Sequence, residues 1–181
     1  NGTLTESGVI SGTTASHSKL TKTGTGTVYL NQAANTYTGQ TTVGQGTLQV
    51  DKLAAGGSSS SLGATVASTA IVLGDGTNAA TLEYKGTTGD SSDRQFTITS
   101  GSTGTIYASN ASFSALTLSG AVANNGDLTF NVVNGTLTES GVISGTTASH
   151  SGVTKAGTGT LTLSNASSSY AGTTTIKQGS L

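Results

Sequence analysis

Cysteine, proline, methionine and tryptophan are all absent from this chain of 181 residues. Without cysteine the chain can form neither a disulfide framework nor a thiolate metal site, and such a chain suits export in an unfolded state. Charged residues make up only 8% of the sequence, and the formal net charge is −1. This balance gives no electrostatic attraction to nucleic acid or to an anionic membrane surface, so we expect no nucleic-acid partner.

Hydrophobic residues are also scarce, at 33%, and aromatic residues make up 4%. A compact globule with a large core is therefore not expected. Disordered chains of low hydrophobicity are typically rich in charge and proline, whereas here threonine, serine and 27 glycines take their place. Threonine suits a pleated surface, and the lack of proline lets every backbone N–H bond to a neighbouring strand. The composition predicts strands that are stacked many deep.

The chain repeats itself, because the sequence that starts at Asn1 starts again at Asn134. The block Asn1–Ser18 returns without a change as Asn134–Ser151, and the two copies then stay in register. Self-similarity without insertions is typical of repeat architectures, in which each unit buries its apolar face against its neighbours. We expect residues 1–181 to form a single continuous segment, with 1–133 as one full repeat unit and 134–181 as the start of the next. We also expect this segment to continue at both ends.

Short segments of alternating apolar and polar residues recur along the chain, bounded by Gly, Asn, Asp or Ser. No stretch shows the apolar period of an amphipathic helix. The alternation predicts strands whose large apolar members point inward. These inward positions are Leu48, Leu82, Phe96, Ile98, Leu116, Leu118, Leu128, Phe130, Leu161 and Leu163.

The spacing of similar phrases indicates how the strands are arranged. Gly-Thr-Val at Thr27 is followed by Gly-Thr-Leu at Thr47. A spacing of roughly 20–25 residues fits one coil of a β-solenoid, so a repeat unit would make about six coils and rise on the order of 30 Å. An antiparallel sandwich is the alternative, but it would need hairpin turns and gives no reason for the repeat of the sequence.

Two stretches carry a resemblance to a known family. Gly24–Leu48 and Gly157–Leu181 resemble the passenger-associated repeat of bacterial autotransporters. Intervening stretches such as Val72–Gly76 and Leu116–Gly120 resemble the sequence usually found between such repeats. The resemblance implies an all-β fold, a right-handed parallel β-helix (β-solenoid) of about 20–25 residues per coil. It also implies export across the bacterial outer membrane and display on the cell surface.

Three positions depart from the pattern of that family. Ser168 stands where the first copy has Asn35, and Gln40 and Thr173 stand where the family favours glycine. A continuous asparagine ladder along that corner is therefore not implied.

The two histidines, His17 and His150, occupy one and the same position of the repeat. A catalytic histidine needs a partner within hydrogen-bond reach, and the nearby carboxylates, Glu6 and Glu139, are duplicated as well. Residues repeated along a rod are typically surface features, so we expect no catalysis here.

The acidic residues Asp90 and Asp93 flank two serines, close in sequence to Asp75. Two carboxylates on a loop could hold Ca²⁺, but this cation needs six to eight oxygens and the spacing of known calcium loops is missing. A solvated corner is the favoured interpretation. Pectin-cleaving enzymes also use β-helices, yet the acidic residues here do not cluster in the sequence. We assign no catalytic, cofactor-binding or metal residue and expect no small-molecule cofactor.

Two tyrosines, Tyr37 and Tyr170, lie at equivalent corners and could form a binding ladder. We favour instead that each ring packs over the turn of its coil, with Gly39 and Gly172 giving room.

Threonine pairs and glycan-acceptor patterns complete the candidates. The pair Thr25-Gly-Thr27 returns as Thr158-Gly-Thr160 only once per repeat unit, whereas the surface of an ice-binding solenoid must repeat on every coil. Acceptor sequons begin at Asn1, Asn110, Asn134 and Asn165, and a chain so rich in Ser and Thr contains such patterns by chance.

These observations predict a non-enzymatic, secreted or cell-surface structural protein that forms an elongated stalk or filament. Its expected partners are further copies of the same repeat, in the same chain or stacked head to tail. The alternative is an autotransporter-type adhesin that recognises a surface ligand and mediates cell–cell or host attachment. The expected location is extracellular, at the bacterial cell surface and associated with the outer membrane.

Overall fold

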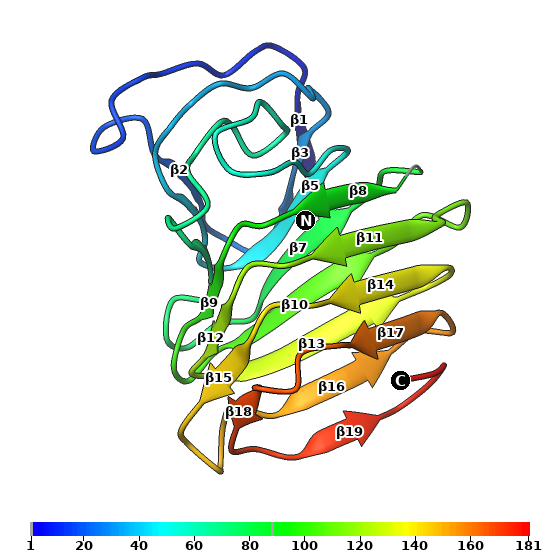
Figure 1. The fold of residues 1–181 in the computed structure, drawn as a ribbon. Coiled ribbons are helices and arrows are strands. Elements are labelled where there is room, and N and C mark those ends of the chain that lie inside the picture. The colour runs from blue at the N-terminus through cyan, green and yellow to red at the C-terminus, as the bar shows by residue number, and fades with distance from the viewer. Residues whose placement is uncertain (1, 88) are drawn as a thin grey trace.

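The structure, a computed structural model, describes residues 2–87 and 89–181. These residues contain 19 β-strands and no helix, and the strands form three sheets (Figure 1). Two of the sheets run the length of the molecule, whereas the third begins only at residue 90. Sheet A has eight strands, in the order β1 (Thr3–Glu6), β3 (Thr27–Leu30), β5 (Gly46–Val50), β7 (Ala80–Tyr84), β10 (Thr103–Ala108), β13 (Asp127–Val132), β16 (Val153–Ala156) and β19 (Thr174–Ile176). Sheet B has seven, in the order β2 (Leu20–Lys22), β4 (Thr41–Val43), β6 (Ile71–Leu73), β9 (Phe96–Ile98), β12 (Val122–Asn124), β15 (Ile143–Gly145) and β18 (Ser169–Tyr170). Sheet C has four, in the order β8 (Asp90–Ser92), β11 (Ala115–Leu118), β14 (Thr136–Glu139) and β17 (Thr160–Leu163).

Neighbouring strands within each sheet are parallel, as in β7, β10 and β13, where each strand pairs with one about a coil away in the sequence. From β7 onward the chain visits sheets A, C and B in turn and then returns to A. Eight strands in sheet A correspond to seven coils (8 − 1). The predicted parallel β-solenoid is confirmed, and the antiparallel sandwich is excluded because a sandwich would pair consecutive strands.

The interior is built from the alternating positions. Nine of the ten predicted inward side chains are buried, and the tenth, Leu163, is half-buried against the core. In sheet A, Leu48, Leu82, Ile106 and Phe130 stand in register on successive strands, so like side chains stack along the axis. Each buried side chain of this size contributes about 1.5–3 kcal/mol, which explains how a chain so poor in apolar residues holds a continuous core.

The outer face of sheet A carries one threonine on every coil. Pairing places eight threonines in a single register: Thr3, Thr27, Thr47, Thr81, Thr105, Thr129, Thr154 and Thr175. β-Branched side chains pack well against one another across neighbouring strands, so this column stabilises the sheet. The sequence pattern shows only one threonine pair per repeat unit, because the coils differ in length and hide the column.

The two copies of the repeated sequence lie on different sheets. Strand β1 belongs to sheet A, but the identical residues Thr136–Glu139 form β14 in sheet C. From β1 to β13 the chain completes five coils in sheet A, and one further face brings it to β14. The unit of residues 1–133 thus spans five and one-third coils and rises about 26 Å. The expectation of about six coils was wrong, because the loop between β5 and β6 lengthens one coil.

Candidate functional site

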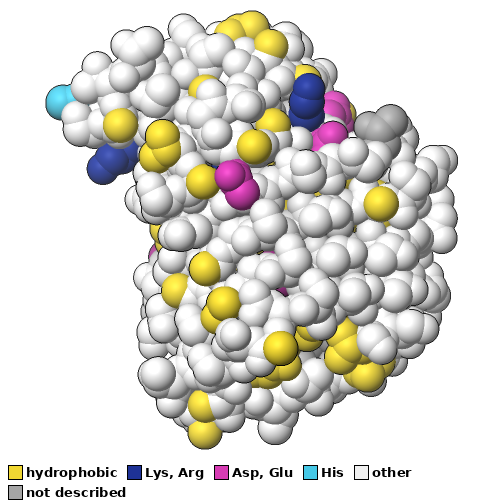
Figure 2. Space-filling view, viewed as in Figure 1, with side chains coloured by type: hydrophobic (Ala, Val, Ile, Leu, Met, Phe, Trp, Pro, Cys, Tyr) yellow, Lys and Arg dark blue, Asp and Glu magenta, His cyan; other side chains and the backbone are white. Residues whose placement is uncertain are grey.

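The outer surface is dominated by small uncharged side chains. Figure 2 shows only scattered charged and apolar groups, and the lower half of the face in view carries almost no charge. One shallow hollow of about 430 Å³ is lined by Asn131, Val133, Ala156, Gly157, Thr158 and Gln178. These side chains offer amide and hydroxyl groups but no acid or base, so the hollow lacks the groups needed for proton transfer.

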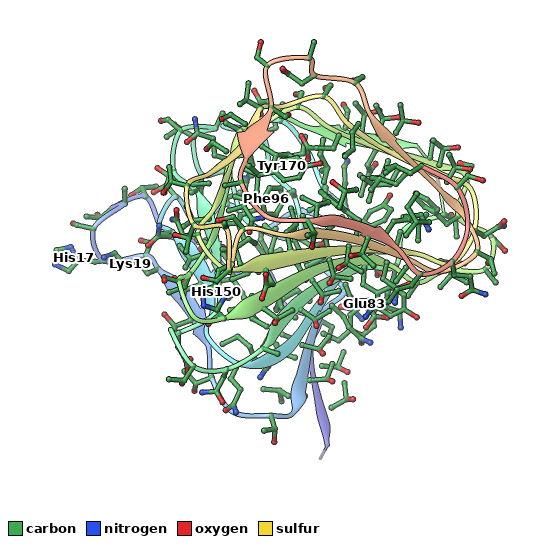
Figure 3. All side chains as sticks on the ribbon, turned by 90° about the horizontal axis from the view of Figure 1, so that it is seen from below. His17, Lys19, Glu83, Phe96, His150 and Tyr170 are labelled. Carbon is green, nitrogen blue, oxygen red and sulfur yellow. The ribbon has the colours of Figure 1, made fainter. Side chains whose placement is uncertain are left out.

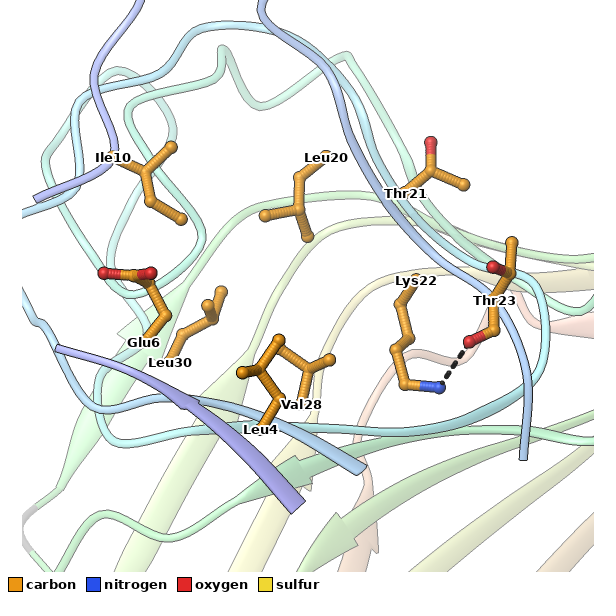
Figure 4. A pocket seen from close by; sticks show the side chains of 9 residues that line it. All are labelled: Leu4, Glu6, Ile10, Leu20, Thr21, Lys22, Thr23, Val28 and Leu30. Atoms are coloured by element: carbon orange, nitrogen blue, oxygen red, sulfur yellow. Dashed lines mark hydrogen bonds between the residues drawn. The ribbon is translucent and has the colours of Figure 1, made fainter. Parts of the chain in front are cut away.

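A second hollow, of about 360 Å³, opens at the first coil (Figure 4). It is lined by Leu4, Glu6, Ile10, Leu20, Thr21, Lys22, Thr23, Val28 and Leu30. These are the inward faces of β1, β2 and β3, together with the loop after β1. The hollow is therefore the interior of the solenoid seen from its open end.

The repeated block allows a direct comparison of this interior with and without a coil above it. The side chain of Leu4 is 66% exposed, whereas the equivalent Leu137 is fully buried at 0%. Glu6 is exposed, whereas the equivalent Glu139 is 1% exposed. Both strands pair in parallel with the strand that follows them in their sheet. Only the second copy also has a preceding strand, β11, beside it, so the preceding coil accounts for the difference in exposure.

Among the carboxylic acids that the structure describes, Glu139 has the pKa that departs furthest from its ordinary value. Its Oε1 accepts a hydrogen bond from Gly141 N at 2.8 Å, and its Oε2 has no partner among the described residues. Burial raises the pKa of Glu139 to about 8, partly offset by the bond from Gly141. Glu6 makes the corresponding bond to Gly8 N at 2.7 Å, but from a solvated position. In the part of the chain that the structure describes, neither glutamate pairs with a histidine.

Both histidines lie outside the solenoid, and Figure 3 shows His17 at the tip of a protruding loop. His17 Nδ1 hydrogen-bonds to the hydroxyl of Ser16 at 2.8 Å. His150 Nδ1 lies 3.7 Å from Asp127 Oδ2, with both side chains about half exposed. An exposed contact of this kind contributes little to stability, and these surroundings do not assemble an activated nucleophile.

Two of the three acidic side chains singled out above, Asp90 and Asp93, bind the loop between β5 and β6. Asp90 Oδ2 accepts from Leu53 N at 2.9 Å, and Asp93 Oδ1 accepts from Gly56 N at 2.7 Å. Asp75 lies after β6, and its carboxylate accepts hydrogen bonds from the backbone N–H groups of Thr77 and Asn78. Hydrogen bonds from Asn78 and Thr77 lower the pKa of Asp75 to about 2. Among the residues that the structure describes, no three His, Cys, Asp or Glu side chains converge on one point. Where the chain leaves the sheet, the carboxylates therefore accept the backbone hydrogen bonds that a neighbouring strand would otherwise accept.

Two lysines that were not among the expected inward residues are buried in the solenoid. Lys155 Nζ donates to the carbonyl oxygens of Ala156, Gly157 and Gln178 at 2.6, 2.6 and 3.2 Å, and its side chain is 0% exposed. Lys22 makes the equivalent three bonds in the first copy, and burial lowers the pKa of both ammonium groups. The sequence does contain a signal, because Thr-Lys recurs before Gly-Thr-Gly-Thr in both copies. Each lysine closes the corner between two faces of its coil.

Arg94 is a further buried cation that the sequence did not reveal. Its guanidinium donates to Leu62 O at 2.6 Å and to Gly63 O at 2.7 Å, and burial lowers its pKa. The contact fastens the long loop after β5 to the coil that follows it. An arginine at a strand end gives no indication of a partner so distant in the sequence.

The corner residues behave largely as expected. The Tyr37 ring is buried and its hydroxyl meets Thr41 Oγ1 at 2.8 Å, and Tyr170 repeats this contact with Thr174. Burial raises the pKa of Tyr37 to about 12. Gly39 makes room for the backbone of the preceding coil and not for the ring, because a Cβ there would strike Ser18 O.

The position that departs from the family pattern keeps its hydrogen bond. Asn35 Oδ1 accepts from Ile10 N at 2.8 Å, and Ser168 Oγ accepts from Ile143 N at 3.2 Å in the second copy. A serine thus replaces the asparagine without leaving the N–H unsatisfied.

The asparagines of the sequons also have structural partners. Asn110 Nδ2 donates to Lys85 O at 2.8 Å, and Asn165 Nδ2 donates to Ser140 O at 2.9 Å. Asn134 Nδ2 likewise donates to the carbonyl of Ala111. These amides join neighbouring coils. The sequon at Asn1 lies outside the described residues.

One lateral patch on sheet A combines aromatic and charged groups. Tyr29, Gln49, Glu83 and Tyr107 stand on successive strands in one register. Gln49 Nε2 donates to Glu83 Oε2 at 3.0 Å, and Lys85 Nζ lies 4.7 Å from the centre of the Tyr29 ring. These residues are spread over four coils, so the patch cannot be recognised in the sequence. We call Tyr29, Gln49, Glu83, Lys85 and Tyr107 the tyrosine patch; Figure 3 places Glu83 on the outside of the rod.

Comparison with known proteins agrees with this architecture. The family model of the passenger-associated-transport-repeat matches residues 20–50 and 153–181, and each match contains one of the two buried lysines. The chain is also 42% identical over 121 residues to the adhesin BmaC autotransporter of Brucella suis biovar 1 (strain 1330). The chain is a segment of an autotransporter passenger domain. No solved structure matches it.

This passenger segment forms a β-solenoid, and its family is secreted or displayed at the cell surface. The match covers 66% of the segment but only 3% of the length of the adhesin. Residues 2–87 and 89–181 include no helix long and apolar enough to cross a membrane.

Proposed function

We propose that the passenger segment is one length of a non-enzymatic stalk that stands outside the bacterial outer membrane. Further copies of the unit of residues 1–133 extend the stalk in the same chain. The observation that carries this proposal is sheet A, whose eight parallel strands run without interruption from β1 to β19.

The hydrogen bonds of the charged side chains support a structural role. Lys22, Lys155 and Arg94 donate to backbone carbonyls, and Asp90 and Asp93 accept from backbone N–H groups. Charges committed in this way hold coils together and are not available for catalysis.

The second candidate is an adhesin, in which the segment itself attaches to another cell. Its support is the similarity to an adhesin and the tyrosine patch, because aromatic side chains often anchor interfaces.

An adhesion competition assay separates the two candidates. The purified 181-residue segment is added to bacteria that display the full passenger, together with the host or neighbouring cells to which they attach. A stalk leaves attachment unchanged at every concentration, whereas an adhesive segment inhibits it. Inhibition that is lost in Tyr107→Ala but kept in Thr117→Ala, on sheet C, would establish adhesion through the tyrosine patch and overturn the stalk.

A further inference from the structure

We infer that the exposed interior of the first coil, which we call the seat, is covered by a coil with the sequence of residues 115–132 from a preceding repeat unit. In this arrangement each repeat unit is rotated about the solenoid axis by one third of a turn relative to the unit before it. This inference rests on the proposed function, because it describes how units of the stalk are joined.

The second copy of the block shows which coil covers it. In sheet C, Leu116 and Leu118 lie over Leu137 and Glu139, and in sheet B Val122 lies over Ile143. In sheet A the cover continues in the same way. There the pairs are Leu128 over Val153 and Phe130 over Lys155.

The first copy presents the same seat without its cover. Leu4, Glu6 and Ile10 occupy the positions of Leu137, Glu139 and Ile143 within a block of identical sequence. At the two remaining positions, Leu20 corresponds to Val153 and Lys22 corresponds to Lys155. The five side chains line the hollow of about 360 Å³, so the apolar set Leu116, Leu118, Val122, Leu128 and Phe130 fits both seats.

Backbone hydrogen bonds also match. In the second copy Thr136 N donates to Ser114 O at 3.0 Å, and Ser140 N donates to Leu118 O at 2.8 Å. Thr3 and Ser7 hold these positions in the first copy. An edge of unpaired N–H groups is a template for another strand. The second copy shows that the strand with matching carbonyl groups is β11.

The turn of one third follows from the sheets. Strand β11 covers β14 within sheet C, but β1, the equivalent of β14, lies in sheet A. Sheet C of one unit therefore continues as sheet A of the next, and sheet A continues as sheet B, because β16 corresponds to β2. Three units, 16 coils in all (3 × 5⅓), restore the starting face after about 77 Å. Each surface feature, the tyrosine patch included, then recurs along a helical path around the stalk and faces three directions in turn.

Cysteine pairs test this arrangement, and the chain has no cysteine of its own. A longer chain is made by joining a second copy of residues 1–133 in front of Asn1. Thr117→Cys in the added unit is combined with Thr5→Cys in the original chain, since parallel neighbours about 4.8 Å apart lie within disulfide range. The matched positive control is Thr117→Cys with Thr138→Cys in the 181-residue chain, where these residues are register partners.

The expected result is that both pairs oxidise at similar rates. Asn131→Cys in the added unit, which lies on sheet A, should not cross-link to Thr5→Cys. As a second readout, Leu4→Ala should lower the urea midpoint of the longer chain as much as Leu137→Ala does, while leaving the 181-residue chain unchanged.

Cross-linking through Asn131 in place of Thr117 would overturn the one-third turn. A Leu4→Ala variant of the longer chain that unfolds like its parent would overturn the seat itself. Neither result bears on attachment, so a failed junction is distinguishable from a failed stalk: the competition assay can reject the stalk while the cross-links stand.

Discussion

Glu139→Gln should stabilise the protein at alkaline pH and leave it unchanged in acid. Burial raises the pKa of Glu139 to about 8, against 4.5 for an exposed glutamate. Because the folded state holds its proton more tightly, the stability of the wild type is fully present below pH 4.5 and falls as the pH rises to about 8. At about 1.4 kcal/mol per pKa unit, the loss amounts to roughly 5 kcal/mol above pH 8.

The glutamine variant lacks this ionisation but keeps an oxygen for the bond from Gly141 N. Urea unfolding followed by circular dichroism at pH 4, 6 and 9 measures the difference between variant and wild type. It should be near zero at pH 4 and several kcal/mol in favour of the variant at pH 9. Glu6→Gln, the same change in the exposed copy, is the matched control and should shift stability by less than about 0.5 kcal/mol at each pH. If the unfolding free energies of the wild type and of Glu139→Gln changed in parallel from pH 4 to pH 9, burial of an ionisable Glu139 would be contradicted.

Three further changes probe the coils. Leu118→Asp places a charge in the core and should unfold a coil, costing at least about 3 kcal/mol, whereas Thr117→Asp on the outer face should be nearly silent; equal damage in thermal melts would argue against this register. Lys155→Met leaves three carbonyls without their donor and should cost about 1–3 kcal/mol in urea titrations, with exposed Lys177→Met as the control; no loss would assign the lysine a packing role alone. Tyr37→Phe removes the buried hydroxyl bonded to Thr41 and should lower stability by about 1 kcal/mol in the same assay, and a neutral result would show that the bond does not contribute.

Glycine in the corners has a specific steric role that follows from these contacts. Gly46 and Gly179 adopt φ angles of +74° and +76°, and a Cβ at either would strike carbonyls of the coil before it. Both lie beside the ammonium groups of Lys22 and Lys155, so the tight corner and the buried cation form one unit.

The class of fold and the inward positions of the strands could be predicted from the sequence. Period-two alternation placed Leu82, Phe96 and Leu118 inside, because successive residues of a strand point to opposite sides whatever the strand pairs with. The return of the block Asn1–Ser18 at Asn134 established a repeat, and two short motifs were sufficient to indicate the family.

The stacking of the coils on one another could not be predicted from the sequence, because it depends on contacts between residues that are far apart in the chain. Glu6 and Glu139 have identical neighbours in sequence, yet one is solvated and the other buried, because the cover of Glu139 is the strand one coil earlier in the chain. Likewise, Lys155 finds Gln178 and Arg94 finds Leu62 only after the chain has closed at least one coil. The face on which each copy lies depends on the summed lengths of all intervening coils. A local sequence pattern does not encode that sum, so the rotation between repeat units is a property of the stacked solenoid alone.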